Sequence, residues 1–205
     1  MCGRFYIPMD DGPEELEKLL RDAGLMASEP LPRGEITPGM RVPAVCASRV
    51  SRTPKPFAMT WGYPVQGKLV INARSETAGV RPLFRDSLRD RRCLIPASAW
   101  FEWDHRHGAG TKYRISPSGT DWFCLAGLYR PEGRDARCTI LTRPAEGDMA
   151  ELHDRMPVLL RPDEAAAWLD RDTDPAPYFS RNVKLDLTPV PGQTAQLSLW
   201  ENTDM

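Results

Sequence analysis

Apolar and polar residues alternate in short runs along most of the chain, and 20 prolines separate these runs. Alternation with a period of two is typical of β-strands that bury one face. The pattern therefore predicts many short strands rather than a few long helices. The predicted strands are residues 42–48, 57–62, 68–72, 93–103, 112–116, 122–129, 138–142 and 156–160.

Helical patterns are short and lie between or beside these strands. Asp10 and Pro13 stand before two glutamates, and this order is typical of a helix start. The helix continues to Gly24, and three leucines at helical spacing face a core. Further helices are predicted at residues 82–91, 148–153 and 162–170.

Many short strands with a few short helices predict one α+β domain over residues 1–190. Its core is expected to be a mostly antiparallel, barrel-like β structure with peripheral helices. A length of 205 residues fits a single domain with a sizeable core. Residues 191–205 begin within a Pro-Val-Pro-Gly stretch and are predicted to form a C-terminal tail.

Charge changes the picture in one region. The formal net charge is −1, which argues against a polycation that coats nucleic acid without selectivity. Arginines nevertheless concentrate between Arg74 and Arg92, and a local basic face suits one particular anionic structure. For Arg85 and Arg89 a solvated helix face is the alternative. No membrane-length apolar run or signal-peptide core is visible, so a cytoplasmic protein is expected.

Five cysteines without a Cys-x-x-Cys pair indicate neither a disulfide framework nor a metal site. Four of them, Cys46, Cys93, Cys124 and Cys138, lie in or beside apolar runs, and we expect them to be reduced core residues. No cofactor is indicated.

The fifth cysteine, Cys2, follows the initiator Met1. Removal of Met1 would leave a free α-amine on the residue that carries the thiol. The reference pKa values are about 7.7–8.0 for the amine and about 8.5 for the thiol, so both groups are partly deprotonated near neutral pH. The pair can condense with an aldehyde to close a five-membered ring, or the thiolate can attack an acyl carbon. A cysteine placed there by chance is the third alternative.

Three further segments carry candidate chemistry. Asn72 and Arg74 lie where a strand ends in a polar turn, which in many proteins only caps the turn. Glu102 lies among three aromatics in Trp-Phe-Glu-Trp, where burial would raise a carboxyl pKa; a strand-edge glutamate facing water is the alternative. His153 precedes Asp-Arg-Met-Pro and is one of three histidines; a structural role is its alternative.

Together, MCGRF, INARSET, RRCLIP followed by WFEW, and LHDRMPVLL resemble the SRAP (SOS-response-associated peptidase) family over residues 1 to about 160. The resemblance implies a covalent sensor of abasic sites in single-stranded DNA, with lyase-type chemistry and an autoprocessing peptidase activity. It implies that Cys2 forms a thiazolidine with the ring-opened sugar, that Asn72 orients the substrate, and that Glu102 and His153 are catalytic. The DNA-binding residues that it implies are Arg4, Arg74, Arg81, Thr142 and Arg155.

Two departures from the family pattern concern DNA binding. Only residues 65–70 stand between Trp-Gly-Tyr-Pro and Ile71, where the family usually has a longer loop with another Trp. Glu35, in Glu-Ile-Thr-Pro, stands where an amide is usual.

Other functions remain open from the sequence. They are an N-terminal-nucleophile amidohydrolase, a thiol peptidase that pairs Cys2 with His153, and a non-catalytic binding module. The amidohydrolase would need an Asn-Gly for its oxyanion hole, and the chain has none.

The tail carries one further motif. Gln196, Leu197, Leu199 and Trp200 resemble the pentapeptide that binds the bacterial replication sliding clamp. The resemblance implies the clamp as a partner and a location at the nucleoid. A last β-strand that packs its leucines on the core is the alternative.

Overall fold

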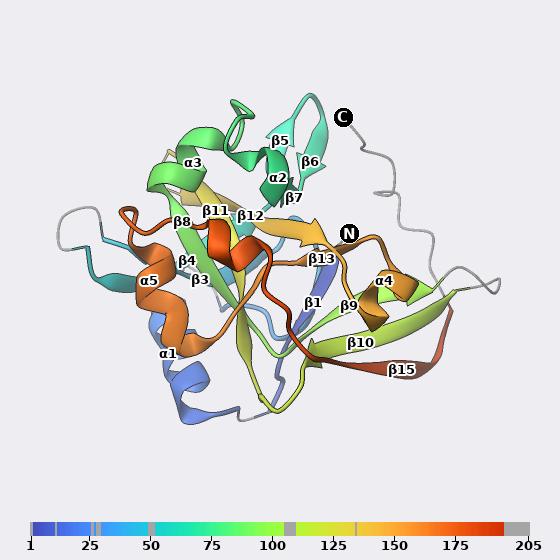
Figure 1. The fold of residues 1–205 in the computed structure, drawn as a ribbon. Coiled ribbons are helices and arrows are strands. Elements are labelled where there is room, and N and C mark those ends of the chain that lie inside the picture. Colours follow the sequence, from blue (N-terminus) through green and yellow to red (C-terminus); the bar gives the residue numbers. More distant parts are fainter. Residues whose placement is uncertain are drawn as a thin grey trace.

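The computed structural model describes residues 2–10, 12–25, 27, 30–48, 52–104, 110–133 and 135–194. Their fold is dominated by strands, with short helices around them (Figure 1). This confirms the predicted α+β class with a mostly β, barrel-like core. Within the described ranges, no helix is long and apolar enough to cross a membrane.

Five strands close into a barrel, because β11 and β4 both pair with β12 and so complete a ring through β3 and β8. The β12–β4 pair is parallel, and the other four are antiparallel. Three short strands extend this sheet: β7 and β13 pair with β12, and β14 pairs with β11. The bounds are β3 Arg41–Ala47, β4 Pro54–Trp61, β7 Asn72–Arg74, β8 Arg92–Ala97, β11 Phe123–Glu132, β12 Asp135–Pro144, β13 Arg155–Pro157 and β14 Leu159–Leu160.

A second, antiparallel sheet has the strand order β15-β10-β9-β1-β2. Residues 93–103, predicted as one strand, belong to both sheets, because the chain turns from β8 into β9 at Ser98. The Ser98 backbone amide donates to the Tyr6 carbonyl at 2.9 Å and so fixes this turn against β1. The bounds are β1 Arg4–Ile7, β2 Gly34–Ile36, β9 Ala99–Asp104, β10 Thr111–Pro117 and β15 Leu185–Thr194.

A hairpin of β5 (Tyr63–Val65) and β6 (Lys68–Val70) forms the short segment that precedes Ile71. Its turn residues Gln66 and Gly67 have φ values of 49° and 80°. Positive φ at both central residues is typical of a tight two-residue hairpin turn. The short segment is therefore a projecting β-hairpin, visible at the top of Figure 1.

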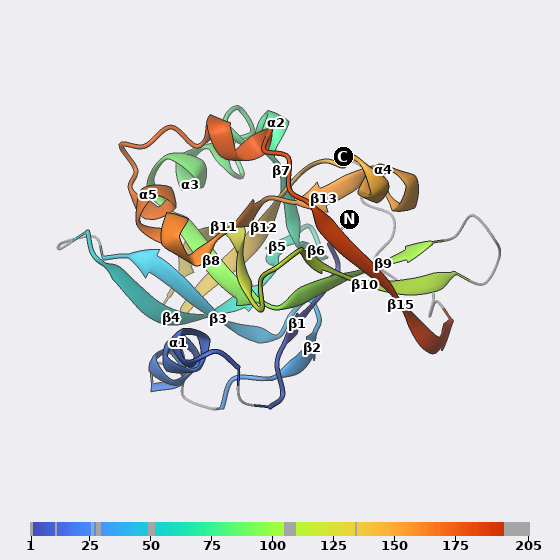
Figure 2. The same ribbon diagram turned by 60° about the horizontal axis from the view of Figure 1, so that its bottom comes forward.

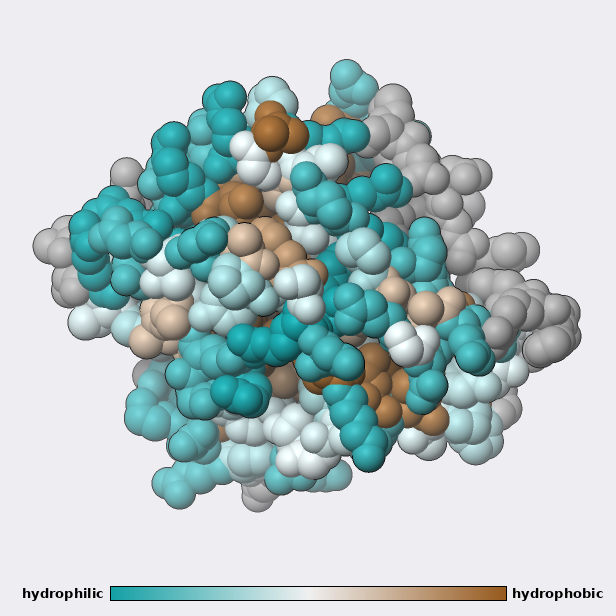
Figure 3. All heavy atoms as spheres, viewed as in Figure 1, coloured by the Kyte–Doolittle hydropathy of each residue, from teal (hydrophilic) through white to brown (hydrophobic). Residues whose placement is uncertain are grey.

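The helices are peripheral and mostly shorter than predicted. Helix α1 packs on β3 and β4 (Figure 2), where Leu16 and Leu20 are buried. Helix α5 packs on β8. The face in Figure 3 is largely hydrophilic, with small scattered apolar patches. The bounds are α1 Glu14–Leu25, α2 Ser75–Ala78, α3 Arg85–Asp90, α4 Asp148–Leu152, α5 Ala165–Leu169, and 3₁₀ turns at Pro162–Glu164 and Ala176–Phe179.

The core joins the two sheets through aromatic rings. Phe5 of β1 lies 5.2 Å from Trp61 of β4, and Trp100 of β9 lies 6.0 Å from Phe123 of β11, centroid to centroid. All four side chains are buried. Burial of one such ring stabilises the fold by about 2 kcal/mol. The N-terminal strand is thereby anchored in the interior.

Strand β15 crosses the predicted boundary between domain and tail. It pairs with β10 as far as Thr111 opposite Thr194, so residues 191–194 lie in the sheet. The prolines at 189 and 191 predicted a linker, but β15 is an edge strand, where a missing backbone N–H is tolerated. The clamp-like motif at Gln196–Trp200 lies outside the described residues.

Candidate active site at the N-terminal cysteine

Cys2 lies immediately before β1 and is fully buried. Its Sγ is 4.0 Å from the Arg4 carbonyl oxygen. From the barrel sheet, the Asn72 side-chain amide donates a hydrogen bond to the Cys2 carbonyl oxygen at 3.1 Å. The buried Asn72 Oδ1 accepts no hydrogen bond within the described part of the chain. The two sheets thus bring Cys2 and Asn72 into direct contact.

Glu102 is only 4% exposed, which excludes the water-facing alternative. It lies on the inner face of β9 with Trp100, whereas Phe101 and Trp103 contact Lys112 on the other face. Burial raises the pKa of the Cys2 thiol, and the negative charge of Glu102 raises it further. In the chain that still carries Met1, Cys2 is therefore a neutral thiol at neutral pH, near enough to Glu102 for the two charges to interact.

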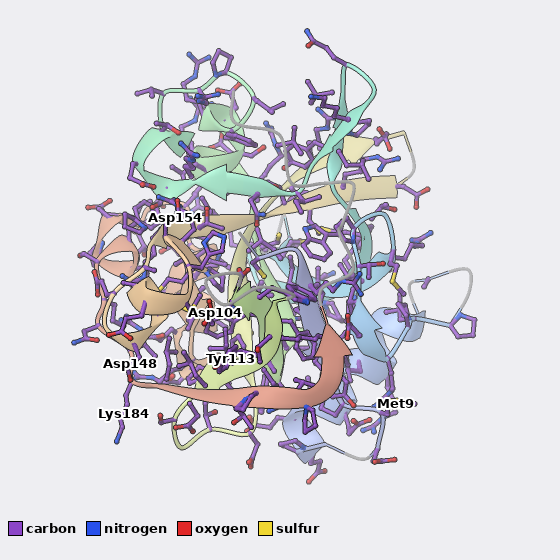
Figure 4. All side chains as sticks on the ribbon, turned by 90° about the vertical axis from the view of Figure 1, so that its right-hand side faces the viewer. Met9, Asp104, Tyr113, Asp148, Asp154 and Lys184 are labelled. Atoms are coloured by element: carbon purple, nitrogen blue, oxygen red, sulfur yellow. The ribbon has the colours of Figure 1, made fainter. Side chains whose placement is uncertain are left out.

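His153 follows α4, and its backbone amide donates to the Met149 carbonyl at 2.9 Å. Its Nδ1 accepts the Arg155 backbone N–H at 3.0 Å and lies 2.6 Å from Asp154 Oδ1. The two contacts require different states of the ring: Nδ1 accepts the Arg155 N–H only when the proton is on Nε2, and it donates to Asp154 only when Nδ1 itself is protonated. Helix α4 packs against β9. Figure 4 labels Asp154, which follows His153, and Asp104, the last residue of β9.

Arg155, two residues after His153, is buried and forms an ion pair with the partly exposed Glu76. Its guanidinium binds both carboxylate oxygens of Glu76, and it donates to the carbonyl oxygen and Oγ1 of Thr142 at 2.8 and 3.3 Å. These hydrogen bonds from Arg155 lower the pKa of Glu76 to about 2. Glu76 was assigned no role from the sequence, although it lies in the INARSET segment, because the sequence alone did not reveal its pairing with Arg155.

Strand β12 is the common support of these groups. It places Ile140 opposite Asn72 and Thr142 opposite Arg74 on one side, and Thr142 opposite Pro157 on the other. Thr142 and Arg155, predicted as DNA contacts, are buried and bonded to each other. Their contact with DNA stays a prediction, and their visible role is to hold the His153 segment.

The remaining predicted DNA contacts differ in setting. Arg74 and Arg81 are exposed: Arg74 directly precedes α2, and Arg81 lies in the turn after it. Arg4 is partly exposed on the outer face of the second sheet, bonded to Glu35 and stacked over Trp103. Of the described residues, no group of three or more His, Cys, Asp or Glu side chains is arranged to hold a metal ion.

The structure is thus a barrel-centred α+β domain in which an asparagine holds a buried cysteine next to the N-terminus, with a buried glutamate near it. The model of the SOS response associated peptidase (SRAP) family matches residues 1–197, and the chain belongs to that family.

Two similar proteins are named as abasic site processing proteins. The chain is 32% identical over 188 residues to the abasic site processing protein YoqW of Bacillus subtilis, covering 85% of this chain and 83% of YoqW. It is 27% identical over 151 residues to the abasic site processing protein YedK of Escherichia coli, covering 70% and 67%. A phage-related protein of Bordetella bronchiseptica has a similar crystal structure, with TM-score 0.70, 28% identity and 93% and 94% coverage.

Proposed function

We propose that this protein is a covalent sensor of abasic sites in single-stranded DNA, acting through Cys2 after removal of Met1. The observation that carries the proposal is the Asn72 hydrogen bond that holds the buried Cys2, with the buried Glu102 near enough to raise the pKa of the thiol. A neutral thiol with a carboxylate next to it suits slow addition to an imine carbon. Relatives described as abasic site processing proteins support the same substrate.

The chemistry needs no oxidant and no second substrate. The Cys2 amine attacks the aldehyde carbon of the ring-opened sugar, and loss of one water gives a Schiff base. The sulfur then adds to the same carbon, and its proton moves to the imine nitrogen as the thiazolidine closes. The Schiff base also acidifies the neighbouring C–H, so some strand cleavage by β-elimination, a lyase reaction, is an expected side reaction.

Each neighbouring group has a role in these steps. Glu102 takes the thiol proton and passes it to nitrogen. His153 Nε2 donates a proton to the ring oxygen as the closed sugar opens. Asn72 holds the Cys2 backbone, and its buried Oδ1 would gain a hydrogen bond from the Cys2 amine or a sugar hydroxyl.

DNA would reach the site along cationic side chains on both sides of Cys2. Arg74 and Arg81 are exposed and would contact phosphates beside the lesion, and Arg4 would contact the strand across β1. Thr142 and Arg155 would act beneath the sugar by holding the His153 segment. Because the lesion has no base, this arrangement requires no base-edge contacts.

The site fits the two hydrolytic alternatives less well. A thiol peptidase or an N-terminal-nucleophile amidohydrolase requires an activated thiolate, and reactive cysteines have a depressed pKa. In the chain that still carries Met1, burial and Glu102 raise the pKa of Cys2 instead. Peptide cleavage is proposed here only as autoprocessing, the removal of Met1.

A denaturing-gel shift with abasic single-stranded DNA tests the proposal. The wild-type protein should form a heat-stable adduct, Cys2→Ala should not, and Cys2→Ser should keep only a Schiff base that borohydride traps. Cys46→Ala is the matched control, because Cys46 is a partly exposed, free cysteine on β3, and it should crosslink like wild type. A heat-stable band in Cys2→Ala would refute the proposal.

The partner proposal rests on the tail sequence. Gln196, Leu197, Leu199 and Trp200 would bind the apolar groove of a sliding clamp, and the tether would raise the effective concentration near replication at the nucleoid. Binding of a peptide of residues 192–205 to the clamp should be lost with Leu199→Ala/Trp200→Ala, while crosslinking by the full chain stays unchanged. Equal binding of the wild-type and the Leu199→Ala/Trp200→Ala peptides to the clamp would show that this motif is not a clamp-binding site.

A further inference from the structure

Three charged side chains meet on the outer face of the second sheet. Glu35 of β2 accepts a hydrogen bond from Arg4 of β1 through Oε1 at 2.6 Å, and its Oε2 binds the ammonium group of Lys112 of β10 at 2.5 Å. The side chains of Arg4 and Glu35 are 30% and 27% exposed, whereas that of Lys112 is 4% exposed. One carboxylate therefore neutralises an accessible cation and a fixed, buried one at the same time.

Aromatic rings hold the two cations in place. Lys112 Nζ lies 4.2 Å from the centre of the Phe101 ring and 5.5 Å from that of Trp103, and the Arg4 guanidinium lies 5.6 Å from the Trp103 ring. Cations alternating with rings on a sheet face are features that bind a single strand of nucleic acid. Trp103 adjoins Glu102 in β9, and Arg4 lies two residues from Cys2, so this face borders the candidate active site.

Glu35 is an anion where a DNA backbone would need cations. Burial by itself would raise the pKa of Glu35, but the hydrogen bonds and charges of Lys112 and Arg4 outweigh it and lower the pKa. The carboxylate is therefore ionised throughout the neutral range. A phosphate that approaches Arg4 is attracted by the guanidinium and repelled by the negative charge of Glu35 beside it.

We propose that Glu35 is an internal competitor for the DNA phosphate, which occupies Arg4 in the free protein and weakens non-covalent binding of DNA on this face. The inference rests on the proposed DNA-binding function. It makes Glu35 a residue that limits capture of undamaged single strands, so that stable attachment depends on the covalent step at Cys2. Phosphate must displace the carboxylate from Arg4 before that guanidinium can contribute.

Binding of an undamaged, fluorescently labelled single-stranded oligonucleotide tests this independently of crosslinking. Glu35→Gln removes the charge and keeps one hydrogen-bond acceptor, the amide oxygen, which either Arg4 or Lys112 can use. We expect its affinity to rise about three- to tenfold at low salt and its salt slope to steepen by up to about one unit. Asp172→Asn is the matched control: it removes one carboxylate from an exposed ion pair with Arg52. Asp172 follows α5, which lies at the opposite end of the view from β10 and β15 (Figures 1 and 2). The affinity of the Asp172→Asn variant for the oligonucleotide should change less than about twofold.

The gain should depend on Arg4. In an Arg4→Gln background, Glu35→Gln should give a clearly smaller gain, because the repulsion of Glu35 is removed but no guanidinium is released. If Glu35→Gln fails to fold, Glu35→Asp keeps a charge beside Lys112 and withdraws the carboxylate from Arg4, and about a twofold gain is expected. Unchanged or weaker binding in Glu35→Gln with Arg4 present, a gain of the same size in the Arg4→Gln background, or a slower crosslink at unchanged affinity overturns the proposal. Absence of the Cys2 adduct with increased affinity in Glu35→Gln would instead reject the proposed function alone.

Discussion

The Asn72 side chain binds the backbone of Cys2, with Nδ2 3.1 Å from the carbonyl oxygen of a residue 70 positions earlier in the chain. Asn72 begins β7 in the barrel sheet, and Cys2 leads into β1 of the second sheet. One hydrogen bond therefore connects the two sheets at the point where the chemistry is proposed. It fixes the residue whose amine and thiol must both reach one carbon atom.

Replacing Asn72 by Ala should slow crosslinking to abasic single-stranded DNA by about tenfold or more, because a lost hydrogen bond costs about 1 kcal/mol and the reacting groups lose alignment. Single-turnover rates of adduct formation measure the effect. Asn182→Ala, at an exposed position, is the control and should react like wild type. An unchanged rate in Asn72→Ala would show that the hydrogen bond is only structural.

Glu102→Gln and His153→Ala should each slow adduct formation by about a hundredfold or more, since both side chains are proposed to move protons in the reaction. DNA affinity should change little, because neither group is proposed to contact a phosphate. Glu132→Gln is a control at a solvent-exposed carboxylate that pairs with Arg137. Weaker binding with an unaltered chemical rate would assign the two residues to substrate binding instead.

Much of the fold was predictable because its elements are local patterns. The alternation of residues 112–116 and 138–142 gave strands β10 and β12, and the acidic start after Asp10 gave α1. The break at Ser98 was not predictable, since it depends on a hydrogen bond to Tyr6 across the second sheet. Likewise, the prolines of β15 are compatible with a strand only because β15 lies at an edge.

The candidate site was predictable by residue type but not by pairing. Cys2, Asn72 and Glu102 carry candidate chemistry by residue type, but the Asn72–Cys2 hydrogen bond and the raised pKa of the Cys2 thiol depend on burial and pairing that only the fold supplies. The Glu76–Arg155 pair joins residues 79 positions apart and leaves no local signal. Glu35 was noticed as a departure, but its two cationic partners come from distant strands.

Arg74→Gln and Arg81→Gln should weaken DNA binding and lower the slope of log K against log salt by about one unit each. Both side chains are exposed beside the segment that starts at Asn72. Arg89→Gln is the control: Arg89 is exposed on α3 and paired with Asp90, and its loss should leave the slope unchanged. A salt dependence identical to wild type in Arg74→Gln and Arg81→Gln would make those arginines structural.

The Glu76–Arg155 pair should make stability depend on pH in acid. Hydrogen bonds from Arg155 hold the pKa of Glu76 at about 2 in the folded protein, below its ordinary value near 4.5. A lowered folded-state pKa gives stability that is fully present above about pH 4.5 and is lost as the pH falls towards 2. Because the Glu76 side chain is 45% exposed, the contribution is screened to about 1 kcal/mol.

Glu76→Gln should therefore lower the Tm at pH 7 and flatten the fall of Tm between about pH 4.5 and 2. It should also slow crosslinking, since Arg155 holds the His153 segment through its backbone N–H. Glu17→Gln is the matched control, because hydrogen bonds from Arg33 lower the pKa of Glu17 to about 2 on the distant α1. It should flatten the same acid transition and leave crosslinking unchanged. Equal crosslinking rates in the two variants would separate the Glu76–Arg155 pair from the chemistry and leave it a purely structural contact.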